Sequence, residues 1–235
     1  MTTIPILQAR RLNVGGVRLY EIGGVLYPSV TSILQVIARP GLVAWARRTT
    51  IEVVRAALDG TGGPYAREEL EAILEAASRE PERVRDRAAG QGSSVHEAVS
   101  LALAGEPYPP ALAPQVEAAL AFLADYGLQA LATEVVVVSR AHGYAGTCDL
   151  VAEGRDGLVV ADWKSGGLWP EHALQLGAYA IAIEEMTGLP VGAAYLVGLR
   201  PDGGYEAKGV RLEEARPAFI FALGLWRALR GELYG

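Results

Sequence analysis

The stretch from Gly146 to Lys164, GTCDLVAEGRDGLVVADWK, decides the fold of this chain. Two runs rich in Val and Leu flank Gly154-Arg155-Asp156-Gly157, a sequence typical of a tight turn between antiparallel strands. The stretch therefore predicts a β-hairpin, with Asp149 on its first strand and Asp162-Trp163-Lys164 at the end of its second.

The turn allows two registers. If Arg155 and Asp156 form the loop, Asp149 lies directly opposite Asp162; if Asp156 and Gly157 form it, Asp149 faces Lys164. Side chains alternate along a strand, so Asp162 and Lys164 share one face and the intervening tryptophan points to the other. Both registers predict that two carboxylates and an amine converge.

This convergence favours a divalent metal site. Cross-strand Cβ atoms lie roughly 5 Å apart, and facing like charges are destabilising, so a compensating cation is expected between the carboxylates. Mg²⁺ or Mn²⁺ prefers oxygen ligands and can make a bound water more acidic. Such a site suits the cleavage of a phosphodiester by water. In that reaction Lys164 would orient or deprotonate the attacking water, or stabilise charge on the phosphorane intermediate. The base role requires that the pKa of Lys164 lie well below the lysine reference value of about 10.4.

The alternative is a surface hairpin with solvated charges. Composition favours the site, because the 21 basic residues include only two lysines, Lys164 and Lys208, and one of them falls in this triad. A metal enzyme acting on another phosphoester would also fit the triad.

Two neighbouring segments add to the pattern. Trp169-Pro170-Glu171 begins a helical stretch to about Met186, in which Gln175 and Tyr179 stand four apart on one face. Upstream, Gly92 to His96 has the composition of a capped helix start, with the histidine in its first turns.

In this order, the His96 helix, Asp149, Asp162-Trp163-Lys164, Gln175 and Tyr179 resemble the PD-(D/E)XK nuclease superfamily, and its RecB-type branch in particular. The segments 27–34 and 42–46 are similar to the phage and mitochondrial genome-maintenance exonucleases. The shared motifs extend from about residue 27 to 180.

The resemblance implies roles for individual residues. Asp149, Asp162 and Lys164 would be catalytic, and one or two Mg²⁺ or Mn²⁺ ions would be bound by His96, Asp149, Asp162 and the backbone carbonyl of Trp163. Glu134 would be a second-metal or supporting residue, and Gln175 and Tyr179 would steady the site or the nucleic acid. The single cysteine, Cys148, excludes an iron-sulfur cluster held by four cysteines and is expected to be a core residue.

A basic helical segment is the candidate for further substrate contacts. Arg47 and Arg48 lie beside Trp45, and this stretch has few acidic residues, whereas the arginines of 79–87 alternate with Glu and Asp. Arginines would bind phosphates and Trp45 would stack on a base or pack inward. The net charge of −6 argues against a protein coated with non-specific nucleic-acid contacts.

The expected fold class is α/β (α+β): a restriction-endonuclease-like core with a mixed central sheet flanked by helices, preceded by a small β-hairpin and a helical extension. We expect one domain over 1–235, with the hairpin and a helical gate or arch in 1–90 and the catalytic core in 91–235. Breaks between helices are expected at 61–64 and at Pro81. Helices are expected at 41–58, 65–79, 81–104, 113–126 and 212–230, and a strand at 191–199.

These observations predict a metal-dependent DNA exonuclease that acts on single-stranded or flapped ends in phage or bacterial replication, recombination or repair. Alternatives are a RecB-type endonuclease, a duplex-end exonuclease of the lambda type, or a non-catalytic nucleic-acid-binding protein that keeps the fold. Replication or recombination proteins are expected partners. The absence of a signal peptide or a long apolar run predicts a cytoplasmic protein without membrane contact.

Overall fold

The computed structural model describes residues 3–37, 40–61 and 63–230. The chain forms two compact units, one made of Met1–Ile37 with Ser94–Gly235, the other of Ala38–Ser93. The N-terminal strands therefore belong to the larger unit, and the smaller unit is helical. Each unit is described by itself below.

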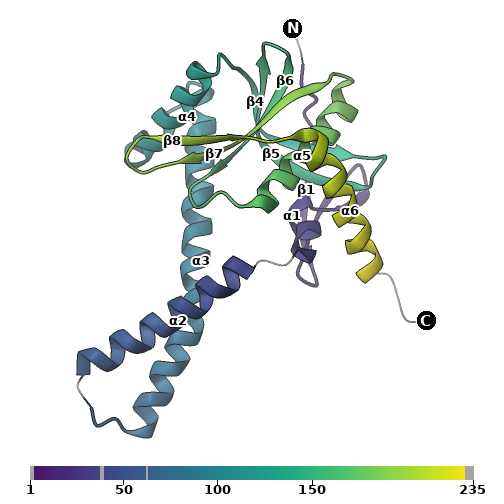
Figure 1. Cartoon of the computed structure of the whole chain (residues 1–235). Coiled ribbons are helices and arrows are strands. Elements are labelled where there is room, and N and C mark those ends of the chain that lie inside the picture. The colour runs from purple at the N-terminus through teal and green to yellow at the C-terminus, as the bar shows by residue number, and fades with distance from the viewer. Residues whose placement is uncertain (1–2, 38–39, 62, 231–235) are drawn as a thin grey trace. The chain divides into compact units, whose positions relative to one another are not determined.

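The larger unit is built on a five-stranded mixed sheet with the order β4-β5-β6-β7-β8 (Figure 1). Only the β6–β7 pair is parallel among its neighbours. This confirms the expected fold class, a mixed sheet flanked by helices. The strands are β4 (Gln129–Ser139), β5 (Tyr144–Gly154), β6 (Gly157–Lys164), β7 (Val191–Leu199) and β8 (Tyr205–Gly209).

The decisive hairpin adopts the first of the two registers. Gly154 pairs with Gly157 and Leu150 with Ala161, so Arg155 and Asp156 form a two-residue loop. Continuing this pairing places Asp149 opposite Asp162. The arrangement in which Asp149 faces Lys164 does not occur.

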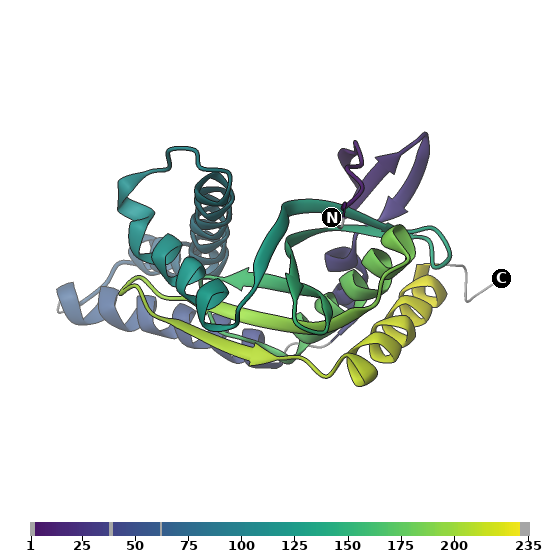
Figure 2. The same ribbon diagram turned by 90° about the horizontal axis from the view of Figure 1, so that it is seen from above.

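Helices cover both faces of the sheet. Figure 2 shows α5 and α6 together on one side and α4 on the other. The two helices α5 and α6 pack closely at Gly177, which has no side chain. A Cβ at this position would lie only 2.6 Å from the carbonyl carbon of Ala215. The helices are α4 (Ala113–Asp125), preceded by the 3-10 turn η2 (Pro110–Leu112), α5 (Pro170–Thr187) and α6 (Leu212–Arg230).

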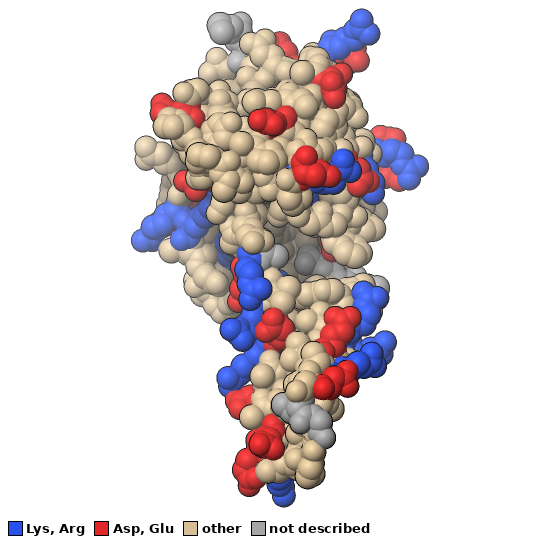
Figure 3. All heavy atoms as spheres, turned by 90° about the vertical axis from the view of Figure 1, so that its left-hand side faces the viewer, with Lys and Arg blue, Asp and Glu red and all other residues tan. Residues whose placement is uncertain are grey.

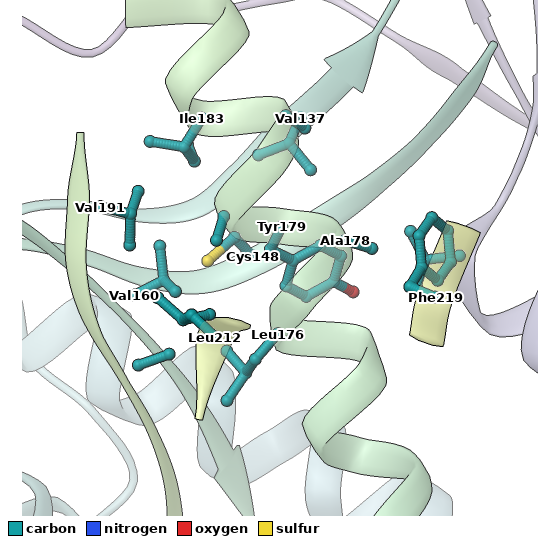
Figure 4. Packing of buried hydrophobic residues seen from close by; sticks show 14 of the residues in the cluster. Val137, Cys148, Val160, Leu176, Ala178, Tyr179, Ile183, Val191, Leu212 and Phe219 are labelled. Atoms are coloured by element: carbon teal, nitrogen blue, oxygen red, sulfur yellow. The ribbon is translucent and has the colours of Figure 1, made fainter. Parts of the chain in front are cut away.

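Each face has its own hydrophobic core. On the α5/α6 face, Cys148 and Val160 of the sheet pack against Tyr179, Ile183 and Phe219 (Figure 4). On the other face, Trp163 packs on α4, with its ring 5.8 Å from that of Phe122 and nearly perpendicular to it. Cys148 is thus a buried core residue, as expected.

A small antiparallel sheet lies beside β5. Its order is β1-β2-β3, with β1 at Arg10–Val14, β2 at Val17–Ile22 and β3 at Val25–Pro28. Ser29 caps the short helix α1 (Val30–Ile33), which continues into the 3-10 turn η1 (Leu34–Val36), and Ser29 also forms a bridge with Ala145. The small sheet is therefore fixed to β5 just before the GTCD segment.

The helical unit contains α2 (Pro40–Thr61) and most of α3 (Arg67–Leu103). The break expected at Pro81 was wrong, because Pro81 lies inside α3. The helix start expected at Gly92 to His96 was also wrong, since these residues lie within the same helix. Glu, Arg and Ala on both sides favour helix strongly enough to offset the roughly 3 kcal/mol cost of a proline and to override the serine cap signal.

Charge on the helical unit is mixed. Ion pairs along α3 include Arg67–Glu71 and Arg79–Glu75, and Figure 3 shows basic and acidic side chains alternating over the surface of this unit. Of the helices in the described residues, none is long and apolar enough to span a membrane.

Candidate active site

One cavity of about 170 Å³ in the larger unit contains most of the residues that the sequence singled out. It lies at the end of the β5–β6 hairpin that is away from the turn, and residues of the small sheet and of the N-terminal part of α5 also line it. The predicted residues that line it are His96, Glu134, Asp149, Asp162, Lys164, Gln175 and Tyr179.

Asp149 lies where the β5–β6 ladder ends. Beyond the Leu150–Ala161 pair, its Oδ2 accepts a hydrogen bond of 2.8 Å from the backbone N–H of Trp163. The carboxylate thus replaces the next ladder bond, and its side chain is held at the edge of the cavity. Only 7% of the residue is exposed.

Trp163 contributes its backbone to the site and its side chain to the core. While its ring packs on Phe122, its carbonyl oxygen lies 2.9 Å from Nε2 of His96. On the other side of the ring, Nδ1 faces Asp149 Oδ2 at 3.4 Å. The tryptophan carbonyl, expected to bind metal, is therefore paired with the histidine in this structure.

Asp162 and Lys164 form an ion pair on the same face of β6, as the alternation predicts. The other carboxylate oxygen, Oδ1, accepts a 3.0 Å hydrogen bond from Gln175 Nε2, which also donates to the Tyr179 hydroxyl at 2.8 Å. Tyr179 is buried. Gln175 and Tyr179 are thus brought together as a chain that positions Asp162, and their substrate-binding role stays a prediction.

Gly146 leaves room for this chain. A Cβ at this position would lie 2.6 Å from Cε1 of Tyr179. A side chain here would therefore displace the tyrosine ring, which explains on steric grounds why the GTCD segment has a glycine at this position.

Glu134 has an unusual backbone. Its φ of 50° is in the left-handed region, which costs a non-glycine residue about 1–2 kcal/mol. The flanking residues turn to opposite faces of the sheet: Thr133 bonds to Ser100 of α3, whereas Val135 packs in the α5/α6 core. The kink directs the Glu134 carboxylate toward the cavity, beside Asp149.

The donor set fits a hard divalent cation. One atom each from His96, Glu134 and Asp149 lie within 4.8 Å of one another. Asp162 adds Oδ2, which is buried and, among the described residues, has the ion pair with Lys164 but no hydrogen-bond partner. Three carboxylates and a neutral imidazole nitrogen are ligands that Mg²⁺ or Mn²⁺ accepts. Glu134, expected as a supporting residue, belongs to the group of three whose atoms lie within 4.8 Å of one another, and Asp162 lies outside that group.

The pKa directions reflect the burial and the crowding of carboxylates in this site. Burial and the charge of Asp149 raise the pKa of Asp162 to about 7, although Lys164 opposes the shift. Burial and Asp149 also raise the pKa of Glu134. Burial alone would lower the pKa of His96, but the hydrogen bond and charge of Asp149 outweigh it, so that pKa is raised. A bound cation would relieve this repulsion between carboxylates.

Comparison with known families decides the identity. The sequence model of the PD-(D/E)XK nuclease superfamily matches residues 56–220, well over half of the chain. The chain belongs to the PD-(D/E)XK nuclease superfamily. The family indicates a metal-dependent nuclease that acts on nucleic acid, and His96, Glu134 and Asp149 form a group that could hold a metal ion in this PD-(D/E)XK nuclease.

Other comparisons give less. No curated protein matches this nuclease. Among solved structures, one described as the crystal structure of SSO0001 is similar at 12% sequence identity, covers 79% of this chain and 89% of its own, and has a TM-score of 0.36.

Several cavity residues of the nuclease were not found from the sequence. They come from the small sheet, from α1 and from β5. The sequence showed only the alternation of apolar and polar residues in the N-terminal strands and the Ser29-Val30-Thr31 segment. Nothing in the sequence shows that this sheet packs beside β5. These residues are Arg11, Arg18, Tyr20, Ser29, Thr31 and Thr147.

The predicted substrate contacts on α2 belong to the helical unit. Arg47 and Arg48 are exposed and Trp45 is half-buried, all in the helical unit. Their role in the nuclease stays a prediction.

Proposed function

We propose that this chain is a Mg²⁺- or Mn²⁺-dependent deoxyribonuclease, an exonuclease that hydrolyses single-stranded or flapped DNA ends in phage or bacterial replication, recombination or repair. The observation that carries the metal-dependent hydrolysis is the convergence of Asp149, Asp162, Glu134, His96 and Lys164 in one cavity. The exonuclease activity and the choice of DNA are supported by the sequence resemblance described first.

The chemistry divides among the residues of this cavity. A bound divalent ion supplies a more acidic water and polarises the phosphoryl group. Asp149, Asp162, Glu134 and His96 would hold the ion, and Gln175 keeps the Asp162 carboxylate in place through its 3.0 Å hydrogen bond.

Lys164 stabilises the negative charge that builds up on the phosphoryl oxygens. Its ammonium group is fixed by Asp162 at the cavity wall. From there it donates hydrogen bonds to non-bridging phosphoryl oxygens, where preorganised donors are most effective. A water molecule gives up a proton to solvent as its oxygen adds to phosphorus, the bond to the leaving oxygen breaks, and that oxygen takes a proton from solvent.

Digestion of labelled DNA tests the proposal. Linear single strands, duplexes and closed single-stranded circles, labelled at the 5′ or 3′ end where possible, are incubated with and without Mg²⁺ or Mn²⁺. We expect linear single strands to shorten from an end only with metal, and circles to stay intact. Cleavage of circles would identify an endonuclease, and digestion of duplex ends by a ring-shaped trimer would identify the lambda-type alternative.

An inactive variant separates catalysis from binding. Asp162→Asn is expected to abolish cleavage while DNA binding is retained. If the wild-type protein binds DNA and never cuts it with either metal, the chain is a non-catalytic binding protein and the proposal is wrong.

The closed circle also tests the predicted gate. We propose that the helices expected within residues 1–90 restrict the nuclease to strand ends. Undiminished cleavage of circles, or of linear strands blocked at both ends, would contradict this role.

A further inference from the structure

Two arginines of the small N-terminal sheet line the same cavity as the carboxylates. They are Arg11 on β1 and Arg18 on β2. Both lie outside residues 56–220, the part of the chain that the superfamily model matches. Their presence is therefore a feature of this chain that membership of the superfamily does not explain.

The side chain of Arg11 is held in place. Its Nη2 donates a 2.9 Å hydrogen bond to Thr147 Oγ1, and its Cζ lies 5.7 Å from the centre of the Tyr20 ring. Tyr20 is itself buried, and its hydroxyl lies 2.9 Å from the same Thr147 oxygen. A guanidinium has five N–H donors, so most of them stay free for a ligand.

The backbone of Arg18 is fixed from both sides. Its N–H donates to Ser32 Oγ at 2.9 Å, and its carbonyl accepts from the N–H of Ser29 at 2.9 Å. These bonds connect β2 to the start of α1, which also contributes Thr31 to the cavity. The position from which the Arg18 side chain reaches the cavity is thus set by the fold.

Within the described residues, neither Arg11 nor Arg18 forms an ion pair with an acidic side chain. The charge of Arg11 reaches Glu134 and opposes the rise in the pKa of that carboxyl, but at a longer range than an ion pair. Arg10 gives the contrast: it is next to Arg11 on the same strand, faces the other way, and pairs with Glu21 at 2.6 Å. Two unpaired guanidinium groups beside three carboxylates create a charge separation along one cavity.

This charge separation suits a phosphodiester chain. The acidic end would repel a nucleic acid unless a divalent cation and further positive charge offset it. Thr147, which Arg11 contacts, and Asp149 are two residues apart on β5, which is roughly 7 Å along a strand. Arginine binds phosphate through two parallel N–H donors, and this geometry gives orientation as well as affinity.

We propose that Arg11 and Arg18 bind a phosphate group of the bound strand next to the phosphate that is cut. The inference rests on the proposed nuclease function and adds to it the residues that set the position of the strand. Thr147 and Tyr20 are positioning residues, since they hold Arg11 and leave its remaining donors free.

Direct binding measurements test this without requiring cleavage. In the full-length Asp162→Asn protein, the affinity for a 3′-fluorescein single strand is measured by anisotropy at several salt concentrations. We expect Arg11→Ala and Arg18→Ala each to weaken binding about tenfold and to lower the slope of log affinity against log salt by about one. Arg11→Lys and Arg18→Lys, which keep the charge, should retain the slope with a smaller loss of affinity.

Arg10→Ala is the matched control, since it removes an equal charge from the same strand outside the cavity. If Arg11→Ala and Arg18→Ala behave like Arg10→Ala in affinity and slope, the inference is wrong. Circular dichroism and melting temperatures check that the alanine variants fold, and the lysine variants provide the same comparison if they do not. If binding depends on both arginines but the wild-type protein never cuts DNA, the inference holds and the nuclease proposal fails.

Strands with and without a 5′-phosphate identify the source of the phosphate. If the arginine variants lose affinity equally for both strands, the phosphate that they bind is an internal one. A loss confined to the 5′-phosphorylated strand assigns the terminal one. In the wild-type background, both alanine changes should raise KM more than they lower kcat.

Discussion

Asp162 is 1% exposed, and its carboxylate lies in a cavity that also holds the Asp149 carboxylate. The repulsion and burial that raise its pKa mean that the charged side chain costs stability in the metal-free protein. The same charge is needed to hold a cation. At this residue, stability without metal and the proposed chemistry are therefore opposed.

Replacing Asp162 by asparagine should separate the two effects. At pH 8 in EDTA we expect Asp162→Asn to melt at a higher temperature than the wild-type protein, because a neutral amide replaces a buried charge. We also expect it to lose at least a hundredfold in kcat and most of the rise in melting temperature caused by Mn²⁺. Asp156→Asn, in the exposed turn, is the control; equal melting temperatures for both variants in EDTA would contradict the prediction.

The stability of the metal-free protein should also depend on pH through this group. The pKa of Asp162 is raised from 3.8 to about 7, so between these values the folded protein binds more protons than the unfolded chain. The contribution of Asp162 to the free energy of unfolding is fully present below about pH 4 and is lost as the pH rises through about 7. Urea unfolding in EDTA from pH 4.5 to 8 measures this, and the decline should be shallower in Asp162→Asn.

At the scale of elements, the contact between β5 and α5 sets the position of the site residues. Gly146 on β5 touches the Tyr179 ring of α5, and Tyr179 holds Gln175, which holds Asp162. A change in the spacing of these two elements is therefore transmitted to a carboxylate of the site.

Gly146→Ala tests this coupling. The added methyl group forces the tyrosine ring to move, which should cost about 1–3 kcal/mol of stability and lower kcat about tenfold or more. Gly224→Ala is the matched control, since a Cβ there meets no atom within 4 Å and alanine favours the α6 helix. Thermal melting and cleavage rates measure both, and unchanged activity in Gly146→Ala would show that the Tyr179 chain does not position Asp162.

Many of the helices and strands were predictable from the sequence. The strand at 191–199 and the helix at 212–230 have the expected bounds, because clear hydrophobic patterns end at turn or cap residues. The convergence of the triad was predictable because both possible registers of a two-residue turn bring Asp149 close to Asp162 and Lys164, whereas the register itself was set by the structure. Pro81 and the Gly92 to His96 segment misled, because local break signals gave way to strong helix formers on both sides.

The rest depends on tertiary packing. Glu134 has a left-handed backbone within a strand, and no local signal in the sequence marks it. Arg11 and Arg18 enter the cavity only because Ser29 bridges to Ala145 and brings one sheet beside another. Propensity and alternation describe elements one at a time, so they did not show this contact.

At the scale of the whole molecule, the two units differ in how much they bury. In the described part of residues 38–93, Ala77 is the only fully buried side chain, whereas the larger unit has a core on both faces of its sheet. The ligands proposed for the metal, His96 to Asp162, all belong to the larger unit.

Hydrogen exchange should therefore separate the units. We expect amides of α2 and of residues 67–93 to exchange at least a hundredfold faster than those of β5 and β6, because local opening there exposes little apolar surface. Adding Mn²⁺ should slow exchange in β5 and β6 and leave 40–61 unchanged. Equal protection in both units, or a metal effect confined to the helices, would contradict this.

The two-residue turn at Arg155 and Asp156 also limits how the gene can vary in length. Because Gly154 pairs with Gly157, one inserted or deleted codon would shift the second strand by one position and send Asp162 and Lys164 to the side that Trp163 now occupies. Substitutions in the exposed turn leave this parity untouched. The turn between the two carboxylates can thus accept substitutions, but not the insertion or deletion of a single residue.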